Sequence, residues 1–168
     1  MNKTSLIIVV FISALVFGPL CLGASVSLRG PNGEAELVVK PGEEFQVVVS
    51  VQDAKELLGF DLTVVATGSI SASKASASGS LFTTKQSFAC VCAVPLRVVG
   101  WFPNGASVSG NGQVAVFTLK AGDQEGGGSV TMPLKDLILV GIDSKQVQIA
   151  EPSALRVVVS KDAKGHGE

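Results

Sequence analysis

The feature that most constrains this chain is the alternation of apolar and polar residues over short runs, with helical periodicity almost absent. In the run from Glu44 to Gln52 every second residue is apolar (Phe45, Val47, Val49 and Val51). A second run, from Gly59 to Val64, repeats the pattern with Phe60, Leu62 and Val64. Because successive side chains of a strand point to opposite faces, these runs predict strands with one buried face.

A third run, Gly112–Lys120, is apolar on both sides and predicts a strand in the middle of a sandwich. Two registers remain open for it, with either Val114, Val116 and Thr118 or Ala115, Phe117 and Leu119 facing inward. Further strands are expected at Ser25–Leu28, Glu36–Val39, Ser87–Val91, Arg97–Phe102, Ser129–Pro133, Ile138–Val140 and Ala154–Val159. A single helical turn is predicted at Asp53–Leu58.

Turn-forming residues separate these runs. Positive or fixed φ angles are available at Pro31–Gly33, Lys40–Gly42, Pro103–Gly105, Gly110–Gly112 and Gly126–Gly128. Strands joined by such turns at short spacing predict an all-β sandwich or barrel. The segment Ser69–Ser80 is rich in serine and alanine, lacks bulk to bury, and is expected to be a surface loop or an exposed edge.

The N-terminal segment has the composition of a secretory signal peptide. Lys3 precedes an apolar run, Leu6–Leu22, and the small residues Gly23 and Ala24 follow it. Gly18 and Pro19 make the run short for a membrane anchor. We therefore expect a signal peptide over residues 1–24, one domain over 25–160, a disordered tail over 161–168, and a secreted protein at the cell surface or outside it, with no membrane contact after cleavage.

Charge and side-chain chemistry exclude several classes of function. The formal net charge of the 168 residues is −1, so there is no basic surface for nucleic acid. The one histidine, His166, lies in the tail, which leaves the other nucleophiles without an evident base. Four zinc ligands cannot be assembled either. We expect no enzymatic activity, no metal site and no cofactor.

Two cysteines remain after signal cleavage, Cys90 and Cys92. Their i, i+2 spacing in a strand puts the Cα atoms about 6.5–7 Å apart, near the outer limit for a disulfide. Export to an oxidising compartment favours a bridge. A Cys90–Cys92 disulfide and a pair of core-facing thiols both remain open, with a slight preference for the thiols.

Several blocks of this sequence resemble cohesin domains. Pro41–Leu62 is similar to the cohesin strand, short link and second strand that contain the G-E-x-F-x-V and L-x-G-F patterns. Val108–Lys120 looks like the later "s-G-s-G-x-l-a" strand, and Gly128–Leu134 like the strand that follows it. The chain departs from the cohesin pattern at Val65–Gly68, where cohesins usually carry a tyrosine-aspartate-proline turn.

The resemblance implies a two-sheet jelly-roll β-sandwich of about nine strands, the fold that cohesins share with a group of bacterial carbohydrate-binding modules. Cohesins bind dockerins, which are small calcium-loaded helical modules of polysaccharide-degrading enzymes. It therefore implies a non-catalytic module that binds either a dockerin-like protein or a polysaccharide. The alternative is a structural surface or adhesion subunit that associates with itself.

Four residues are candidates for the binding surface. The resemblance puts Asp61 on the sheet that faces a partner, and Thr63 follows on the same side of the strand. Trp101 is an aromatic residue at the edge of a loop, and Asn104 lies in the turn after it.

Overall fold

The computed structural model describes residues 23–77, 79–81, 88–92 (main chain only) and 95–163. Two short 3-10 helices, η1 (Pro103–Gly105) and η2 (Leu134–Asp136), accompany the strands. The strands are β1 (Ser25–Arg29), β2 (Glu36–Val39), β3 (Glu44–Gly68), β4 (Ile70–Ser76), β5 (Phe88–Cys92), β6 (Leu96–Trp101), β7 (Val108–Ala121), β8 (Gly126–Thr131), β9 (Leu137–Gly141) and β10 (Leu155–Val159).

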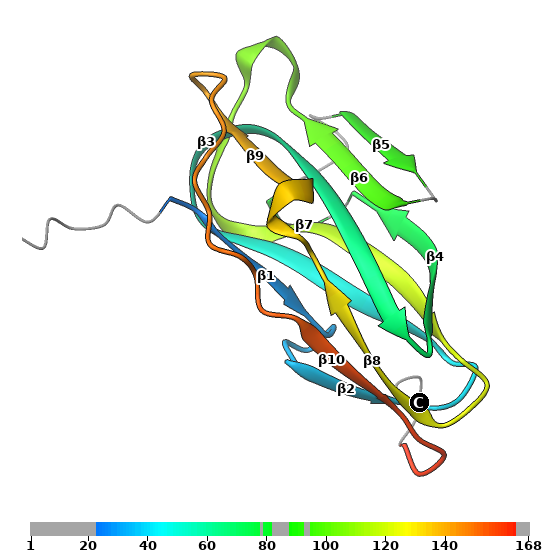
Figure 1. Ribbon diagram of the computed structural model, residues 1–168. Helices are drawn as coiled ribbons and strands as arrows, with labels where there is room; N and C mark the ends of the chain where they lie inside the picture. Colours follow the sequence, from blue (N-terminus) through cyan, green and yellow to red (C-terminus); the bar gives the residue numbers. More distant parts are fainter. Residues whose placement is uncertain (1–22, 78, 82–87, 93–94, 164–168) are drawn as a thin grey trace, which may run out of the picture.

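The strands form a curled sheet that folds back on itself into two layers, as expected for a jelly-roll sandwich (Figure 1). The first half of β3 pairs with β1 and β7, and β7 pairs with β4. The second half of β3 pairs with β6 on one side and with β9 and β8 on the other. Strand β5 extends the sheet beyond β6, and β10 and β2 extend it beyond β8.

Strand β3 is 25 residues long and joins the two layers through a bend. The helical turn predicted for Asp53–Leu58 is wrong, because these residues lie inside β3 at two register shifts, one on each side of Ala54. Asp53 and Glu56 have positive φ angles of 55° and 48°. The two irregularities bring Ala54 and Leu57 to the core three residues apart, a spacing that resembles a helical repeat in the sequence.

Two side chains of β7 hold this bend. The Asp53 N–H donates to Oδ1 of Asn111 at 2.6 Å, and the Glu56 N–H donates to Oγ of Ser109 at 2.9 Å. These bonds satisfy main-chain donors that the interrupted ladder leaves without a strand partner. The predicted turn at Gly110–Gly112 is therefore wrong, since these residues belong to β7 and face the bend.

The core lies between the two layers and confirms the alternation seen in the sequence. Seven predicted core residues are at most 5% exposed: Phe45, Val47, Val49, Phe60, Leu62, Val64 and Phe117. In β7 the register with Ala115, Phe117 and Leu119 inward is the one adopted. Val114 is also buried because it is the extra residue of a bulge, between the pairs Val49–Ala115 and Ser50–Gln113.

The remaining glycine-rich turn prediction, at Gly126–Gly128, is also wrong, because this segment is the first half of β8. A Cβ at Gly128 would overlap the main-chain oxygen of Thr67, so glycine permits β8 to approach the end of β3. The turns at Pro31–Gly33, Lys40–Gly42 and Pro103–Gly105 are confirmed, with positive φ at each of their glycines.

The serine-rich segment forms β4, an edge strand whose partner among the described strands is β7. The sequence predicted either a surface loop or an exposed edge for this segment, and the structure shows the exposed edge.

The predicted tail is described only as far as Ala163, where Lys161 and Asp162 form a turn and Ala163 is buried. Within the described residues, no helix has the length and apolarity needed to span a membrane.

Candidate binding face

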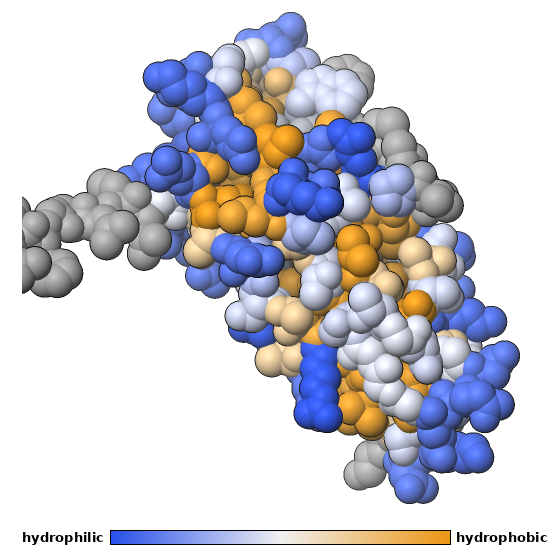
Figure 2. Space-filling view, in the orientation of Figure 1, coloured by the Kyte–Doolittle hydropathy of each residue, from blue (hydrophilic) through white to orange (hydrophobic). Residues whose placement is uncertain are grey.

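The second half of β3, with β6 and β9, presents one face of the sheet to the surface. We call this the outer face; it consists of Asp61, Thr63, Val65, Arg97, Val99, Trp101, Ile138 and Val140. The alternate residues of the same strands, such as Phe60, Leu62 and Val98, are buried in the core. Figure 2 shows the side of the molecule with this half of β3, where hydrophobic areas lie between hydrophilic groups.

Asp61 lies near the middle of the outer face and is paired with Arg97. The Arg97 Nε–H donates to Oδ1 of Asp61 at 2.7 Å, and a second guanidinium N–H donates to Oδ2. The Asp61 side chain keeps 21% of its surface exposed and the Arg97 side chain 45%. Both carboxylate oxygens are thus engaged in a bidentate, charge-assisted contact that still reaches the surface.

Thr63 lies on the outer face, as expected, but only 8% of its surface is exposed. Its direct cross-strand partner is Arg97. Together with Asp61, it lines a hollow of about 390 Å³ that is also lined by Val65, Pro95, Arg97, Lys135, Asp136 and Ile138. Thr63 is therefore covered by longer neighbours that stand around the hollow, and a partner can reach it only by entering the hollow.

The rim of this hollow carries a second pair of charges, on η2. The Nζ of Lys135 lies 3.9 Å from Oδ2 of Asp136. Each of the two carboxylates of the hollow therefore has a cation beside it, and the four charges sum to zero. Leu134, the first residue of η2, is 43% exposed, and Val65 on β3 is 39% exposed. This end therefore combines exposed apolar groups with balanced charges, a composition that protein contact surfaces also have.

Trp101 lies at the other end of the outer face and is 43% exposed. It is directly opposite Gly59, two residues from Asp61 along β3. A Cβ at Gly59 would lie 2.7 Å from the carbonyl oxygen of Gly100 and 3.2 Å from Cβ of Trp101. Glycine at position 59 thus lets β6, at Gly100 and Trp101, lie close against β3. The structure brings Asp61, Thr63 and Trp101 to one face.

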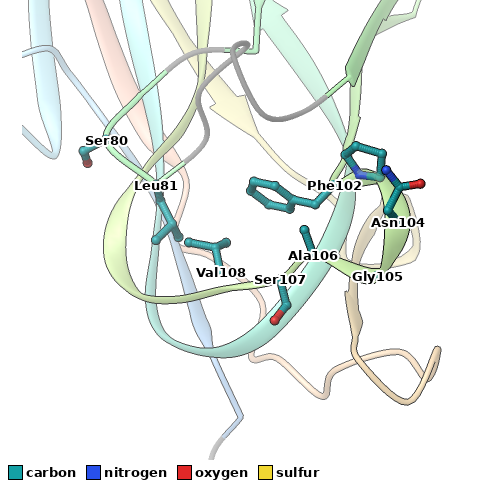
Figure 3. A pocket seen from close by; sticks show the side chains of 9 residues that line it. Ser80, Leu81, Phe102, Asn104, Gly105, Ala106, Ser107 and Val108 are labelled. Atoms are coloured by element: carbon teal, nitrogen blue, oxygen red, sulfur yellow. The ribbon is translucent and has the colours of Figure 1, made fainter.

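Asn104 belongs to a different region. It lines a hollow of about 680 Å³ with Ser80, Leu81, Phe102, Val108 and the residues between Phe102 and Val108. Figure 3 shows the Phe102 ring pointing toward Leu81 and Val108, while the Asn104 amide points away from them. Ser80 Oγ accepts the Gln113 N–H at 3.2 Å. The polar groups around this hollow do not converge on one point, so it lacks the arrangement typical of a small-molecule site.

Arg97, Lys135 and Asp136 are outer-face or rim residues that sequence reasoning missed. Arg97 lies between the buried residues Leu96 and Val98 of β6, so alternation could have put it on the surface side, but its contact with Asp61 depends on which strands are neighbours. The predicted state of Cys90 and Cys92 falls on side chains outside the described residues; their main chain lies in β5, opposite Val99 and Arg97. No group of three or more histidine, cysteine or acidic residues that could hold a metal occurs in the described part of the chain.

Comparison with known proteins identifies the fold. No protein-family model and no curated protein sequence matches the chain. Among solved structures, the non-cellulosomal cohesin of the archaeon Archaeoglobus fulgidus superimposes with a TM-score of 0.62 at 14% identity, covering 82% of this chain and 91% of that one. The third ScaB cohesin of R. flavefaciens, solved with a group 1 dockerin, gives 0.63 at 15% identity, over 82% and 96%.

A third structure, the Coh-OlpA–Doc918 complex of Clostridium thermocellum, is a type I cohesin–dockerin complex and gives a TM-score of 0.61 at 9% identity, over 82% of this chain and 99% of that one. The fold of this chain is therefore the cohesin jelly roll, as the resemblance implied. At these identities the likeness concerns the fold.

Proposed function

We propose that this domain, which has the cohesin fold, is a secreted, non-catalytic module that binds a dockerin-type protein partner through its outer face. The observation that carries the proposal is the outer face itself. It is a sheet surface with Trp101 exposed at one end, Val65 and Leu134 exposed at the other, and the Asp61–Arg97 pair between them. Cohesins of the same fold have been solved in complex with dockerins.

The composition of the face suits a protein partner. Tryptophan and arginine dominate the energetics of protein interfaces, and apolar groups surrounded by polar ones exclude water on docking. The two ion pairs sum to zero charge, so an approaching surface need not carry a large charge of its own. The absence of histidine from residues 1–165 supports a non-catalytic role.

The experiment is a pull-down with the mature domain from the proteins that its source organism secretes, with and without a calcium chelator. Dockerins hold calcium, so the expected result is capture of a dockerin-bearing protein that chelation abolishes. Trp101→Ala should reduce the capture at least tenfold. Val38→Ala is the matched control, because Val38 is 40% exposed but lies on β2, which β8 and β10 separate from β3. Equal capture by both variants contradicts the proposal.

A polysaccharide ligand is the second candidate, and the exposed indole of Trp101 is the observation that favours it, since aromatic faces pack well against the apolar faces of sugar rings. Retention of the domain on insoluble cellulose, lost in Trp101→Ala, would support this reading in place of the first. Concentration-dependent oligomers in sedimentation experiments, without capture or retention, would instead indicate a self-associating structural subunit.

A further inference from the structure

Three of the four asparagines in this chain are followed directly by glycine: Asn32, Asn104 and Asn111. Such pairs are open to deamidation, because glycine has no side chain to keep its main-chain nitrogen away from the asparagine amide. All three asparagines are exposed. Exposure therefore does not distinguish them, and the hydrogen bonds around each amide decide which one reacts.

Asn111 is held within β7. Its Oδ1 accepts the Asp53 N–H at 2.6 Å. The glycine that follows, Gly112, pairs with Val51 across the sheet. Deamidation requires the main chain to rotate until the glycine nitrogen reaches Cγ of the asparagine. In β7 this rotation would break the pairing with β3 and leave main-chain groups without partners.

Asn32 lies in a turn but is tied to its neighbours. Its Nδ2–H donates to Oε1 of Glu34 at 2.9 Å, and its N–H donates to Oε2 of the same side chain at 2.8 Å. The N–H of Gly33, whose nitrogen would be the nucleophile, donates to the carbonyl oxygen of Gly30 at 3.0 Å. Both reacting groups of this pair are therefore engaged, and a reaction must first break these bonds.

The surroundings of Asn104 are different. It lies in η1, a single 3-10 turn, and such turns have hydrogen bonds of poorer geometry than an α-helix. Within the described residues nothing forms a hydrogen bond with its side-chain amide, which points away from Phe102, Leu81 and Val108 (Figure 3). A Cβ at Gly105 would meet no atom within 4 Å, so the main chain has room to rotate.

We propose that Asn104 deamidates spontaneously in the folded protein, whereas Asn32 and Asn111 are protected by their hydrogen bonds. The main-chain nitrogen of Gly105 loses its proton to hydroxide and attacks Cγ of Asn104. The bond from Cγ to the amide nitrogen breaks, and that nitrogen takes a proton from water and leaves as ammonia. Water then opens the cyclic imide at either carbonyl, which gives aspartate or isoaspartate. The loop after Trp101 thereby gains a negative charge, and this inference does not depend on the proposed partner.

The first test compares the three sites in one sample. The folded full chain is incubated in mildly alkaline buffer made with heavy-oxygen water, and peptide mass mapping measures the label, because each deamidation incorporates an oxygen from water. Asn104 should convert roughly tenfold faster than Asn32 and Asn111, since each bond that must break first slows the reaction severalfold. A rate at Asn104 no higher than at the other two overturns the proposal.

The same measurement in concentrated urea separates structure from local sequence. Urea removes the contacts that hold Asn32 and Asn111, so the three rates should converge. If the three rates kept their folded-state order in urea, the difference would come from the neighbouring residues, and the protective role of the hydrogen bonds would be wrong.

The second test removes one protecting side chain. Glu34→Ala releases the Asn32 amide and should raise its deamidation rate toward that of Asn104. Glu36→Ala is the matched control, because Glu36 lies two residues further along the chain and is paired with Arg156 at 3.0 Å. An unchanged rate at Asn32 in Glu34→Ala would contradict the protection.

The third test detects the product without digestion. Native isoelectric focusing of the incubated protein should show a more acidic form that accumulates with time. Asn104→Gln should not produce it, because glutamine would have to close a larger ring and reacts far more slowly. The absence of an acidic form from the unaltered protein, or an equal amount in Asn104→Gln, contradicts the assignment of Asn104.

Discussion

Arg97 and Asp61 are bound to each other although they are not direct cross-strand partners. Arg97 stands opposite Thr63, and its guanidinium reaches diagonally to both oxygens of Asp61. Diagonal neighbours of this kind lie within reach of long side chains on one face of an antiparallel pair. The carboxylate of Asp61, which we expected to contact a partner, is therefore already paired with the guanidinium of Arg97 on the neighbouring strand, and that guanidinium orients it.

The first prediction concerns this acid. Asp61→Ala should weaken binding to the captured partner by about tenfold or more, because it removes a charged acceptor and releases Arg97 from its position. The fold should lose less than about 1 kcal/mol, since a partly exposed ion pair contributes little to stability. Calorimetric titration and urea unfolding measure the two quantities. Unchanged affinity in a folded variant would contradict a role for Asp61 in binding.

The second prediction concerns the core. Phe60→Ala should reduce the free energy of unfolding by about 3–5 kcal/mol, because the removed ring leaves a cavity between the layers. Phe60 is only 2% exposed and lies directly beside Asp61 in sequence. Urea denaturation of Phe60→Ala and Asp61→Ala therefore compares an inward residue and an outward residue of the same strand. A loss below about 1 kcal/mol at Phe60 would mean that β3 has the opposite register.

The third prediction concerns the bend in β3. Glu56 has a φ of 48°, which costs a residue with a Cβ roughly 1–2 kcal/mol. Glu56→Gly should therefore raise the free energy of unfolding, and Glu56→Val should lower it, because a β-branched residue tolerates this conformation least. Asn111→Ala should also destabilise the fold, by about 1 kcal/mol, through loss of the bond to the Asp53 N–H. Equal stability of the glycine and valine variants would contradict the strained conformation.

The fourth prediction concerns pH. The main-chain N–H of Lys145, followed by its side chain, lowers the pKa of Asp143 below its ordinary value of 3.8. A carboxyl group whose pKa is lowered by folding stabilises the folded state above 3.8, and this contribution disappears as the pH falls through the lowered value. The carboxyl resonance of Asp143 should titrate below 3.8. In Lys145→Ala the midpoint should move only part of the way back, because the main-chain bond remains.

The fifth prediction concerns Cys90 and Cys92. Their i, i+2 spacing lies near the limit for a bridge, and we expect both thiols to be reduced in the mature domain. Thiol titration of the denatured protein should find two reactive groups. A monomer with none would establish the disulfide instead.

Local pattern was sufficient to predict most of the strands and their inward faces. Phe45, Val47, Phe60 and Leu62 are buried because alternation along a strand is a property of neighbouring residues, and the sequence contains it directly. The same reasoning misread Asp53–Leu58 as a helical turn. Two bulges within a strand produce an apolar spacing that resembles a helical repeat, and only pairing with β7 distinguishes them.

The glycine-rich segments also show that tertiary contacts can override what local composition predicts. Gly126–Gly128 has the composition of a turn, yet it lies in β8 because the end of β3 approaches too closely for a side chain at Gly128.

The candidate site was predictable only in part. The outward positions of Asp61 and Thr63 followed from alternation, and Trp101 was a candidate because it is an aromatic residue at the edge of a loop.

The contact of Asp61 with Arg97, and the hollow that covers Thr63, were decided by tertiary structure. These depend on β6 lying beside the second half of β3 and on η2 standing next to both. Residues 36 positions apart in the chain meet through strand order and register, which long-range packing determines and no local pattern contains.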